Sequence, residues 1–151
     1  MADEYVSTTV DKFRIKVKKG LIYTQDDVWV QQTGEGYRVG ITDLAQRMGG
    51  DIVFVDFLSK REFRMGEPLA SYETIKAVLD VKAPFDCMVT AFNEELSDRP
   101  ELMNTDPYGE GWVAEVKPVA PGQVKGLLSD QAYFKYMKTK AEAEVRKLKG
   151  I

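Results

Sequence analysis

Histidine is absent from this 151-residue chain, and cysteine occurs once, as Cys87. Without histidine the chain cannot carry Ser-His-Asp or Cys-His catalysis, nor a zinc site with histidine ligands. A single cysteine excludes an internal disulfide and a CxxC redox pair, and its apolar neighbours indicate an inert core residue. A chain with so few reactive side chains is a weak candidate for an enzyme, and demanding chemistry would have to come from an attached group.

Long apolar runs are also missing, and no stretch approaches the length needed to cross a membrane. Residues 1–5 have neither the basic-then-apolar layout of a secretory signal nor the arginine-rich composition of a transit peptide. We therefore expect a cytoplasmic protein that does not associate with membranes. With 44 % apolar and 30 % charged residues, a chain of this length can bury one globular core without disulfides or metals.

The net charge of −3 is unevenly distributed. Residues 1–20 hold five Lys/Arg and three Asp/Glu, residues 130–151 hold six and three, and residues 21–129 hold ten and eighteen. The acidic centre argues against nucleic acid as a partner, because its phosphates would be repelled. An acidic surface suits docking on basic partner proteins.

Short apolar stretches separated by turn residues run through most of the chain. Between residues 12 and 18, apolar and basic residues alternate, which predicts a half-buried strand. Residues 28–30 and 37–39 flank a turn that contains glycine, and they predict a hairpin. Further strands are expected over residues 52–58, 69–73, 77–83, 88–92 and 112–116. Many short strands at this spacing indicate a barrel or a sandwich.

Helical segments are fewer, and their ends carry recognisable capping residues. The helices expected are residues 43–48 (N-cap Thr42, ended by Gly49), residues 97–103, and residues 129–150 (N-cap Ser129, ended by Gly150). The apolar stripe of the last helix, at i+3 and i+4 spacing, consists of Tyr133, Tyr136, Met137, Ala141, Val145 and Leu148. We expect a solvated surface helix, with a membrane-bound or partner-bound helix as the alternative.

One lysine lies between two predicted strands of similar length, in the segment Glu73-Thr74-Ile75-Lys76-Ala77. A lysine at the tip of a hairpin projects into solvent, clear of neighbouring side chains. No neighbouring residue is arranged to activate Lys76 as a nucleophile or Schiff-base amine. It is presented for modification by another enzyme or, in the simpler interpretation, it only adds solubility.

Several ordered motifs in residues 23–134 resemble one family, the H protein of the glycine cleavage system. The lysine segment is similar to that family's lipoylation site, Glu-Ser-Val-Lys-Ala, which would make Lys76 the modified residue. The other matching segments are Val39-Gly40-Ile41-Thr42-Asp43, Ala45-Gln46, Gly50-Asp51-Ile52-Val53, Ala83-Pro84, Asn93-Glu94-Glu95-Leu96, Pro100-Glu101-Leu102 and residues 104–112. The resemblance implies a mainly β fold, a barrel-sandwich hybrid with short helices and a C-terminal α-helix.

The resemblance also implies an organisation and a cofactor. The expected organisation is an N-terminal extension strand (residues 1–20), a lipoyl-carrier domain (21–128) and a C-terminal helix packed on the same domain (129–151). Lipoate would be attached covalently to Lys76 by an octanoyl or lipoyl transferase with lipoyl synthase, or by a ligase. Glu73 and Asp80 are the groups that these lipoylating enzymes would recognise, with simple solvation as the alternative.

The sequence departs from the family around the cleft that receives the lipoyl arm. Where the family has His-Glu-Trp, this chain has Asp27-Val28-Trp29, and Val28 cannot accept a hydrogen bond from an ammonium group. A position that is often polar in the family is Leu44 here, and the residues after the lysine motif are the bulky Val78 and Leu79. We therefore expect an apolar arm cleft lined by Val28, Leu44, Val78 and Leu79.

An apolar cleft would favour an uncharged or thiol-derived cargo over a protonated amine. The main expectation is therefore a relative of the lipoate-binding proteins of sulfur oxidation, with a heterodisulfide-reductase-like complex as partner. The first alternative is an H protein that carries the aminomethyl group and works with glycine decarboxylase, aminomethyltransferase and dihydrolipoyl dehydrogenase. The second is an unlipoylated structural or regulatory relative. For a shuttling carrier a monomer is expected.

Overall fold

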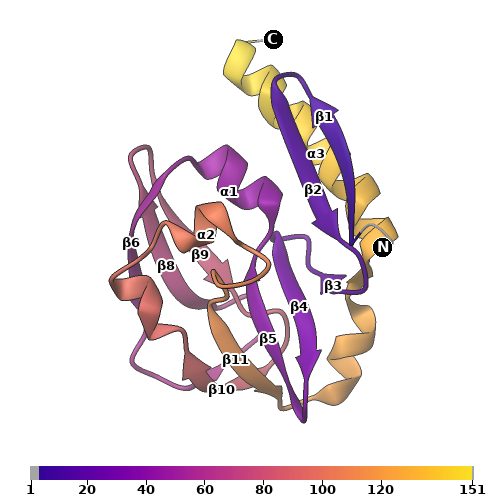
Figure 1. Ribbon diagram of the computed structural model, residues 1–151. Coiled ribbons are helices and arrows are strands. Elements are labelled where there is room, and N and C mark those ends of the chain that lie inside the picture. The colour runs from indigo at the N-terminus through magenta and orange to yellow at the C-terminus, as the bar shows by residue number, and fades with distance from the viewer. Residues whose placement is uncertain (1–3, 151) are drawn as a thin grey trace.

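The computed structural model describes residues 4–150, in which strands predominate (Figure 1). The strands are β1 (Tyr5–Val10), β2 (Phe13–Lys18), β3 (Ile22–Tyr23), β4 (Val28–Thr33), β5 (Gly36–Ile41), β6 (Ile52–Phe57), β7 (Glu62–Phe63), β8 (Pro68–Thr74), β9 (Val78–Lys82), β10 (Cys87–Phe92), β11 (Ala114–Pro118) and β12 (Leu128–Ser129). The helices are α1 (Asp43–Gly49), α2 (Leu102–Thr105) and α3 (Asp130–Lys149), with 3₁₀ turns η1 (Glu94–Ser97) and η2 (Pro121–Gly126). None of the helices in residues 4–150 has the length and apolar character that a membrane span requires.

Two antiparallel sheets enclose the main core. The larger has the strand order β12-β3-β4-β5-β11-β10-β7, and the smaller has the order β6-β8-β9. Aliphatic side chains from both sheets fill the space between them, among them Leu69, Val81, Val89 and Val116. Removal of this apolar surface from water is the main force that holds the sheets together. This mainly β architecture, with short helices and a C-terminal helix, confirms the expected fold class.

A second core lies between the barrel and an outer layer formed by β1, β2 and α3. Figure 1 shows the β1–β2 hairpin and α3 side by side on one flank of the barrel. The largest buried side chains of the second core are the aromatic residues Tyr23, Trp29, Tyr108 and Tyr133. Neighbouring residues on β4 serve different cores, because successive side chains of a strand point to opposite faces: Val28 joins the main core and Trp29 the second.

The N-terminal extension is a hairpin, not the single strand expected within residues 1–20. Strand β1 pairs with β2 from Tyr5 opposite Lys18 to Val10 opposite Phe13. Asp11 in the connecting turn has a positive φ of 55°. The Ser-Thr-Thr run in the middle of β1 carries no apolar alternation, so periodicity alone gave no indication of this strand.

The helix caps match the sequence-based expectation with one shift. Thr42 and Ser129 each accept a hydrogen bond from the backbone amide three residues later, and Gly150 ends α3 in the left-handed conformation. Helix α1 includes Gly49, and Gly50 follows it with φ 87°. The positive φ of Gly50 is a conformation that residues with a Cβ rarely adopt.

Helix α3 buries one face against the second core and leaves the other in solvent. The buried residues are Tyr133, Met137, Ala141 and Val145, as the predicted stripe requires, and Tyr136 is partly buried. Leu148 was wrongly included in the stripe, because the last turn of α3 projects past the hairpin and exposes it (Figure 1).

Candidate functional site

Lys76 lies at the tip of the hairpin formed by β8 and β9, as expected. The buried side chain of Thr74 organises this turn, because its Oγ1 accepts hydrogen bonds from the backbone amides of Lys76 and Ala77, both at 3.1 Å. The amide of Thr74 donates in turn to the carbonyl of Ala77 at 2.9 Å. A short hydroxyl side chain commonly closes a turn in this way. The lysine side chain is therefore exposed on a turn whose backbone is held by hydrogen bonds.

Two glycines end α1, and the side chain of Lys76 lies against Gly50 while that of Leu79 lies against Gly49. A Cβ added to Gly50 would be 3.6 Å from Cε of Lys76, and one added to Gly49 would be 3.2 Å from Cδ1 of Leu79. The separation at Gly49 is tight, so the absence of a side chain there lets Leu79 of β9 lie close against the end of α1, whereas Gly50 is required by its positive φ. The Gly-Gly sequence therefore helps to fix the position of the hairpin tip, and with it Lys76, relative to α1.

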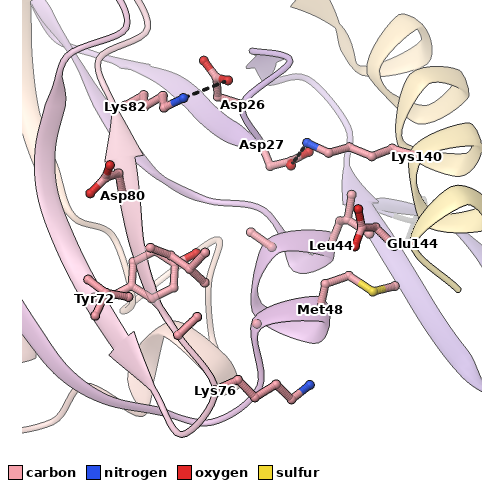
Figure 2. A pocket seen from close by; sticks show the side chains of 15 residues that line it. Asp26, Asp27, Leu44, Met48, Tyr72, Lys76, Asp80, Lys82, Lys140 and Glu144 are labelled. Carbon is pink, nitrogen blue, oxygen red and sulfur yellow. Dashed lines mark hydrogen bonds and ion pairs between the residues drawn. The ribbon is translucent and has the colours of Figure 1, made fainter. Parts of the chain in front are cut away.

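A pocket of about 510 Å³ opens beside Lys76 (Figure 2). The end of α1, the exposed edge of β9, the connection before β4 and the inner face of α3 form its walls. The lining residues are Asp26, Asp27, Leu44, Ala45, Met48, Gly49, Tyr72, Lys76, Ala77, Val78, Leu79, Asp80, Lys82, Lys140 and Glu144. Segments far apart in the sequence therefore meet at one cavity next to the candidate modification site.

Three of the four residues expected in the arm cleft line this pocket, namely Leu44, Val78 and Leu79. Val28 does not, because it is only 1 % exposed and packs in the main core. The preceding residue, Asp27, faces the pocket instead. The expectation that Val28 lines the cleft is therefore wrong. One wall of the pocket, which was expected to be apolar, is polar.

Asp27 is a buried carboxylate at this polar wall. Its Oδ1 accepts a hydrogen bond from the hydroxyl of Tyr133 at 2.7 Å, and its Oδ2 pairs with Nζ of Lys140 (Figure 2). Since Tyr133 donates its only proton to Asp27, the hydroxyl of Thr42, 2.8 Å away, donates to Tyr133. The network thus connects the N-cap of α1, the carboxylate of Asp27 and a lysine of α3.

Burial and pairing act in opposite directions on these two charged groups. Burial raises the pKa of the Asp27 carboxyl, and the hydrogen bonds from Lys140 and Tyr133 only partly offset this rise. Burial lowers the pKa of Lys140, but the hydrogen bond and charge of Asp27 outweigh it and place the pKa above the ordinary value. Sequence reasoning missed both residues; the signal for Lys140 is its place three residues after Met137, at the margin of the buried stripe of α3.

The pocket contains more carboxylates than lysines. Four acidic residues line it, against three lysines, Lys76, Lys82 and Lys140. Lys82 lies 3.9 Å from Asp26, so two of the lysines already face a carboxylate. Asp80 is exposed and forms no ion pair within residues 4–150.

The remaining predicted residues take ordinary positions. Glu73 is exposed on β8, outside the pocket, so the structure does not bring it together with Asp80. Cys87 is fully buried on β10, and burial raises the pKa of its thiol to about 11. A buried thiol that stays protonated at neutral pH is unreactive.

Known proteins match both the sequence and the fold. The family described as "Glycine cleavage H-protein" matches residues 21–140, which is most of the chain. The chain belongs to the glycine cleavage H-protein family. One H-protein relative, the probable glycine cleavage system H protein of Aeropyrum pernix, is 38 % identical over 143 residues, covering 94 % of this chain and 100 % of the relative. The glycine cleavage system H protein of Herpetosiphon aurantiacus is 43 % identical over 123 residues, covering 80 % and 93 %.

The crystal structure of the H protein from Mycobacterium marinum superposes with a TM-score of 0.63 at 30 % sequence identity, covering 73 % of this chain and 98 % of that one. H proteins carry a covalently attached lipoyl group and are not enzymes. They work with glycine decarboxylase, aminomethyltransferase and lipoamide dehydrogenase. The expectation of sulfur oxidation with a heterodisulfide-reductase-like complex is unsupported, and the glycine cleavage alternative fits the relatives better.

Proposed function

We propose that this chain is the lipoyl carrier of a glycine cleavage system, with lipoate in amide linkage to Nζ of Lys76 and the aminomethyl group as its cargo. The observation that carries the proposal is the acidic pocket beside Lys76. Amide formation removes the charge of that lysine, which leaves four carboxylates and two lysines around the pocket. A cavity with this balance attracts a protonated amine, because opposite charges interact strongly where water is partly excluded.

The residues around Lys76 fit a lipoyl group. The lysine side chain lies against Gly50, and Leu44, Met48 and Leu79 offer an apolar wall against which an alkyl chain can pack. When bound, the lipoyl group supplies a dithiolane that opens and closes by thiol–disulfide exchange. The protein supplies position, since tethering at a hairpin tip gives a high effective concentration at each partner.

The corrected pocket also weakens the argument that favoured a sulfur cargo. That argument depended on an apolar cleft lined by Val28, Leu44, Val78 and Leu79; the last three line the pocket, but Val28 lies in the main core. Asp27 and Asp80 supply acceptors for an ammonium group that an apolar cleft would have lacked. Cytoplasmic location, a monomeric state and modification by a transferase or a ligase with Lys76 as target stay predictions that accompany this function.

Intact-mass analysis tests the attachment site. Protein produced in a host that lipoylates proteins should carry a lipoyl or octanoyl adduct, and Lys76→Ala should lack it. Lys82→Ala is the matched control, because Lys82 lines the same pocket and is also exposed. An adduct that persists in Lys76→Ala, or no adduct at all on the unsubstituted chain, would contradict the proposal, and the latter result would support an unlipoylated relative.

A second assay tests the cargo. The lipoylated protein should support glycine decarboxylase and aminomethyltransferase, and Asp80→Asn should reduce its efficiency as substrate by about tenfold to a hundredfold. The loss of one charge-assisted hydrogen bond is worth about 1.5–3 kcal/mol, and each 1.4 kcal/mol is about a factor of ten. Glu35→Gln is the control, since Glu35 is an exposed carboxylate in the turn between β4 and β5 and does not line the pocket. Failure of the fully lipoylated protein in both reactions would exclude glycine cleavage.

A further inference from the structure

The outer face of the small sheet exposes an apolar patch around the base of Lys76. We define the tip patch as the exposed residues Val53, Phe54, Ile75 and Val78. Phe54 is 52 % exposed and Val78 is 64 % exposed. Large apolar side chains that gather on the surface commonly mark an interaction site.

Strand register brings these residues together. Glu73 on the central strand β8 is directly opposite Phe54 on β6 and directly opposite Val78 on β9. Directly opposite residues in antiparallel strands project from the same face of the sheet, so the three form one row next to the hairpin tip. The register shift between Ile52 and Phe54 exposes Val53 beside this row.

Carboxylates surround the apolar side chains of the patch. Glu73 lies in the middle of the row, and Asp51 and Asp56 are exposed on and beside β6. Within residues 4–150, none of these three carboxylates has an ion-pair partner. A complementary surface would therefore have an apolar depression with lysine or arginine at its rim.

We propose that the tip patch is the docking surface for the enzyme that acylates Lys76, an inference that rests on the proposed function. In the acylation step, Nζ attacks the carbonyl of an activated acyl group such as an acyl-adenylate. The amide bond forms, the bond to the AMP leaving group breaks, and Nζ loses a proton. Because an unmodified lysine side chain is short, the acylating enzyme must approach the hairpin tip closely enough to contact its neighbours.

Enzymes that use the modified lysine face a different geometry. Acylation lengthens the side chain greatly, so its reactive end reaches a partner site without contact at the base of Lys76. The pocket lined in part by α1 and α3 serves the long arm, and of the four patch residues only Val78 also lines it. Val53, Phe54 and Ile75 thus form a face for attaching the arm that is separate from the pocket for holding it.

Matched substitutions test this separation. The variant Val53→Thr/Phe54→Thr changes two residues of the patch that lie outside the arm pocket, and it keeps residues that favour strands. Its control is Met65→Thr/Val119→Thr, since Met65 is 56 % exposed and Val119 is 65 % exposed outside the patch. Initial rates would be measured with the unlipoylated full chain, a lipoate–protein ligase, lipoate and ATP, with intact mass as the readout.

We expect kcat/KM for lipoylation to fall about tenfold or more in the patch variant and to change less than about twofold in the control. Circular dichroism and thermal melting establish that both variants are folded. If the double variant unfolds, the single variant Val53→Thr, which keeps the side-chain shape, should still lower kcat/KM by at least about threefold. Equal rates in patch and control variants would overturn the docking surface and leave the proposed function intact.

A second measurement distinguishes attachment from use. The patch variant, brought to complete lipoylation by prolonged incubation, should match the unsubstituted protein with glycine decarboxylase. A parallel loss in that reaction would overturn the inference, because the patch would then belong to the enzymes that use the arm. An unsubstituted chain that takes no adduct under these conditions would overturn the proposed function itself, together with the inference built on it.

Discussion

The main core and the second core differ in what holds them together, and both reach the Lys76 pocket. The main core between the two sheets is largely aliphatic, and strand pairing closes it. The second core is rich in aromatic residues and contains a polar network through Tyr133, Thr42 and Asp27. Aliphatic packing tolerates approximate shapes, whereas a hydrogen-bonded network requires particular partners. The barrel therefore presents the lysine, and the outer layer determines what the far wall of its pocket contains.

The largest expected effect distinguishes the role of Lys76 as the attachment site from a role in stabilising the fold. Lys76→Arg should abolish lipoylation and carrier activity completely, yet change the free energy of unfolding by less than about 0.5 kcal/mol, because the side chain is exposed. Intact mass and urea denaturation measure the two quantities, with Lys82→Arg as control. A large loss of stability in Lys76→Arg would show that the lysine is part of the fold.

A second variant removes the centre of the second core while the barrel stays intact. Tyr133 is fully buried, and its ring stacks on that of Tyr23 with 4.5 Å between centroids. Tyr133→Ala should lower the free energy of unfolding by about 3–5 kcal/mol. At a temperature where the protein stays folded, the rate of Lys76 acylation should be unchanged. A proportionate loss of acylation would show that the two cores cannot be treated separately.

A smaller effect concerns the ion pair that joins the outer layer to the pocket. Asp27→Asn should lower the free energy of unfolding by about 1–3 kcal/mol, since Lys140 and Tyr133 lose a charged acceptor in a buried position. The double variant Asp27→Asn/Lys140→Met should lose less free energy of unfolding than the sum of the losses in the two single variants. Urea denaturation of all four proteins measures this coupling, and strict additivity would show that the pair contributes nothing.

The smallest effect is a dependence on alkaline pH. The pKa of Lys140 in the folded protein lies above its ordinary value of 10.5, so its stabilising contribution is complete below 10.5 and is lost as the pH rises through the folded pKa. Asp27, Tyr136 and Glu144 are the titratable groups near it. Since the ammonium group is partly exposed, we expect a difference of about 1 kcal/mol or less.

Thermal melts of the unsubstituted protein and Lys140→Met between pH 9 and 12, roughly spanning the ordinary lysine pKa, measure this difference. Burial also raises the pKa of Tyr133, so both proteins lose stability in this range because that hydroxyl ionises in the unfolded chain while it stays protonated in the folded one. Only the excess loss in the unsubstituted protein reports Lys140. Parallel curves for the two proteins would contradict the assigned role.

Local patterns predicted much of the fold. Alternation identified β2, capping residues identified α1 and α3, and the position of Lys76 between two strands identified the hairpin tip. The signals succeeded because strand and helix periods are properties of a few consecutive residues. Strand β1 was not predicted, because its polar centre has no alternating pattern of its own and is stabilised by pairing with β2.

The sequence by itself determined that a lysine would stand on a turn between strands, within a mainly β chain that contains motifs of one family. Only the tertiary structure decided what surrounds that lysine. Val28, which was expected in the cleft, lies in the main core, and Asp27, which precedes β4 with a positive φ of 64°, faces the pocket instead. Lys140 meets Asp27 across 113 positions of sequence, a contact that depends on how α3 packs on the barrel and that no local period encodes.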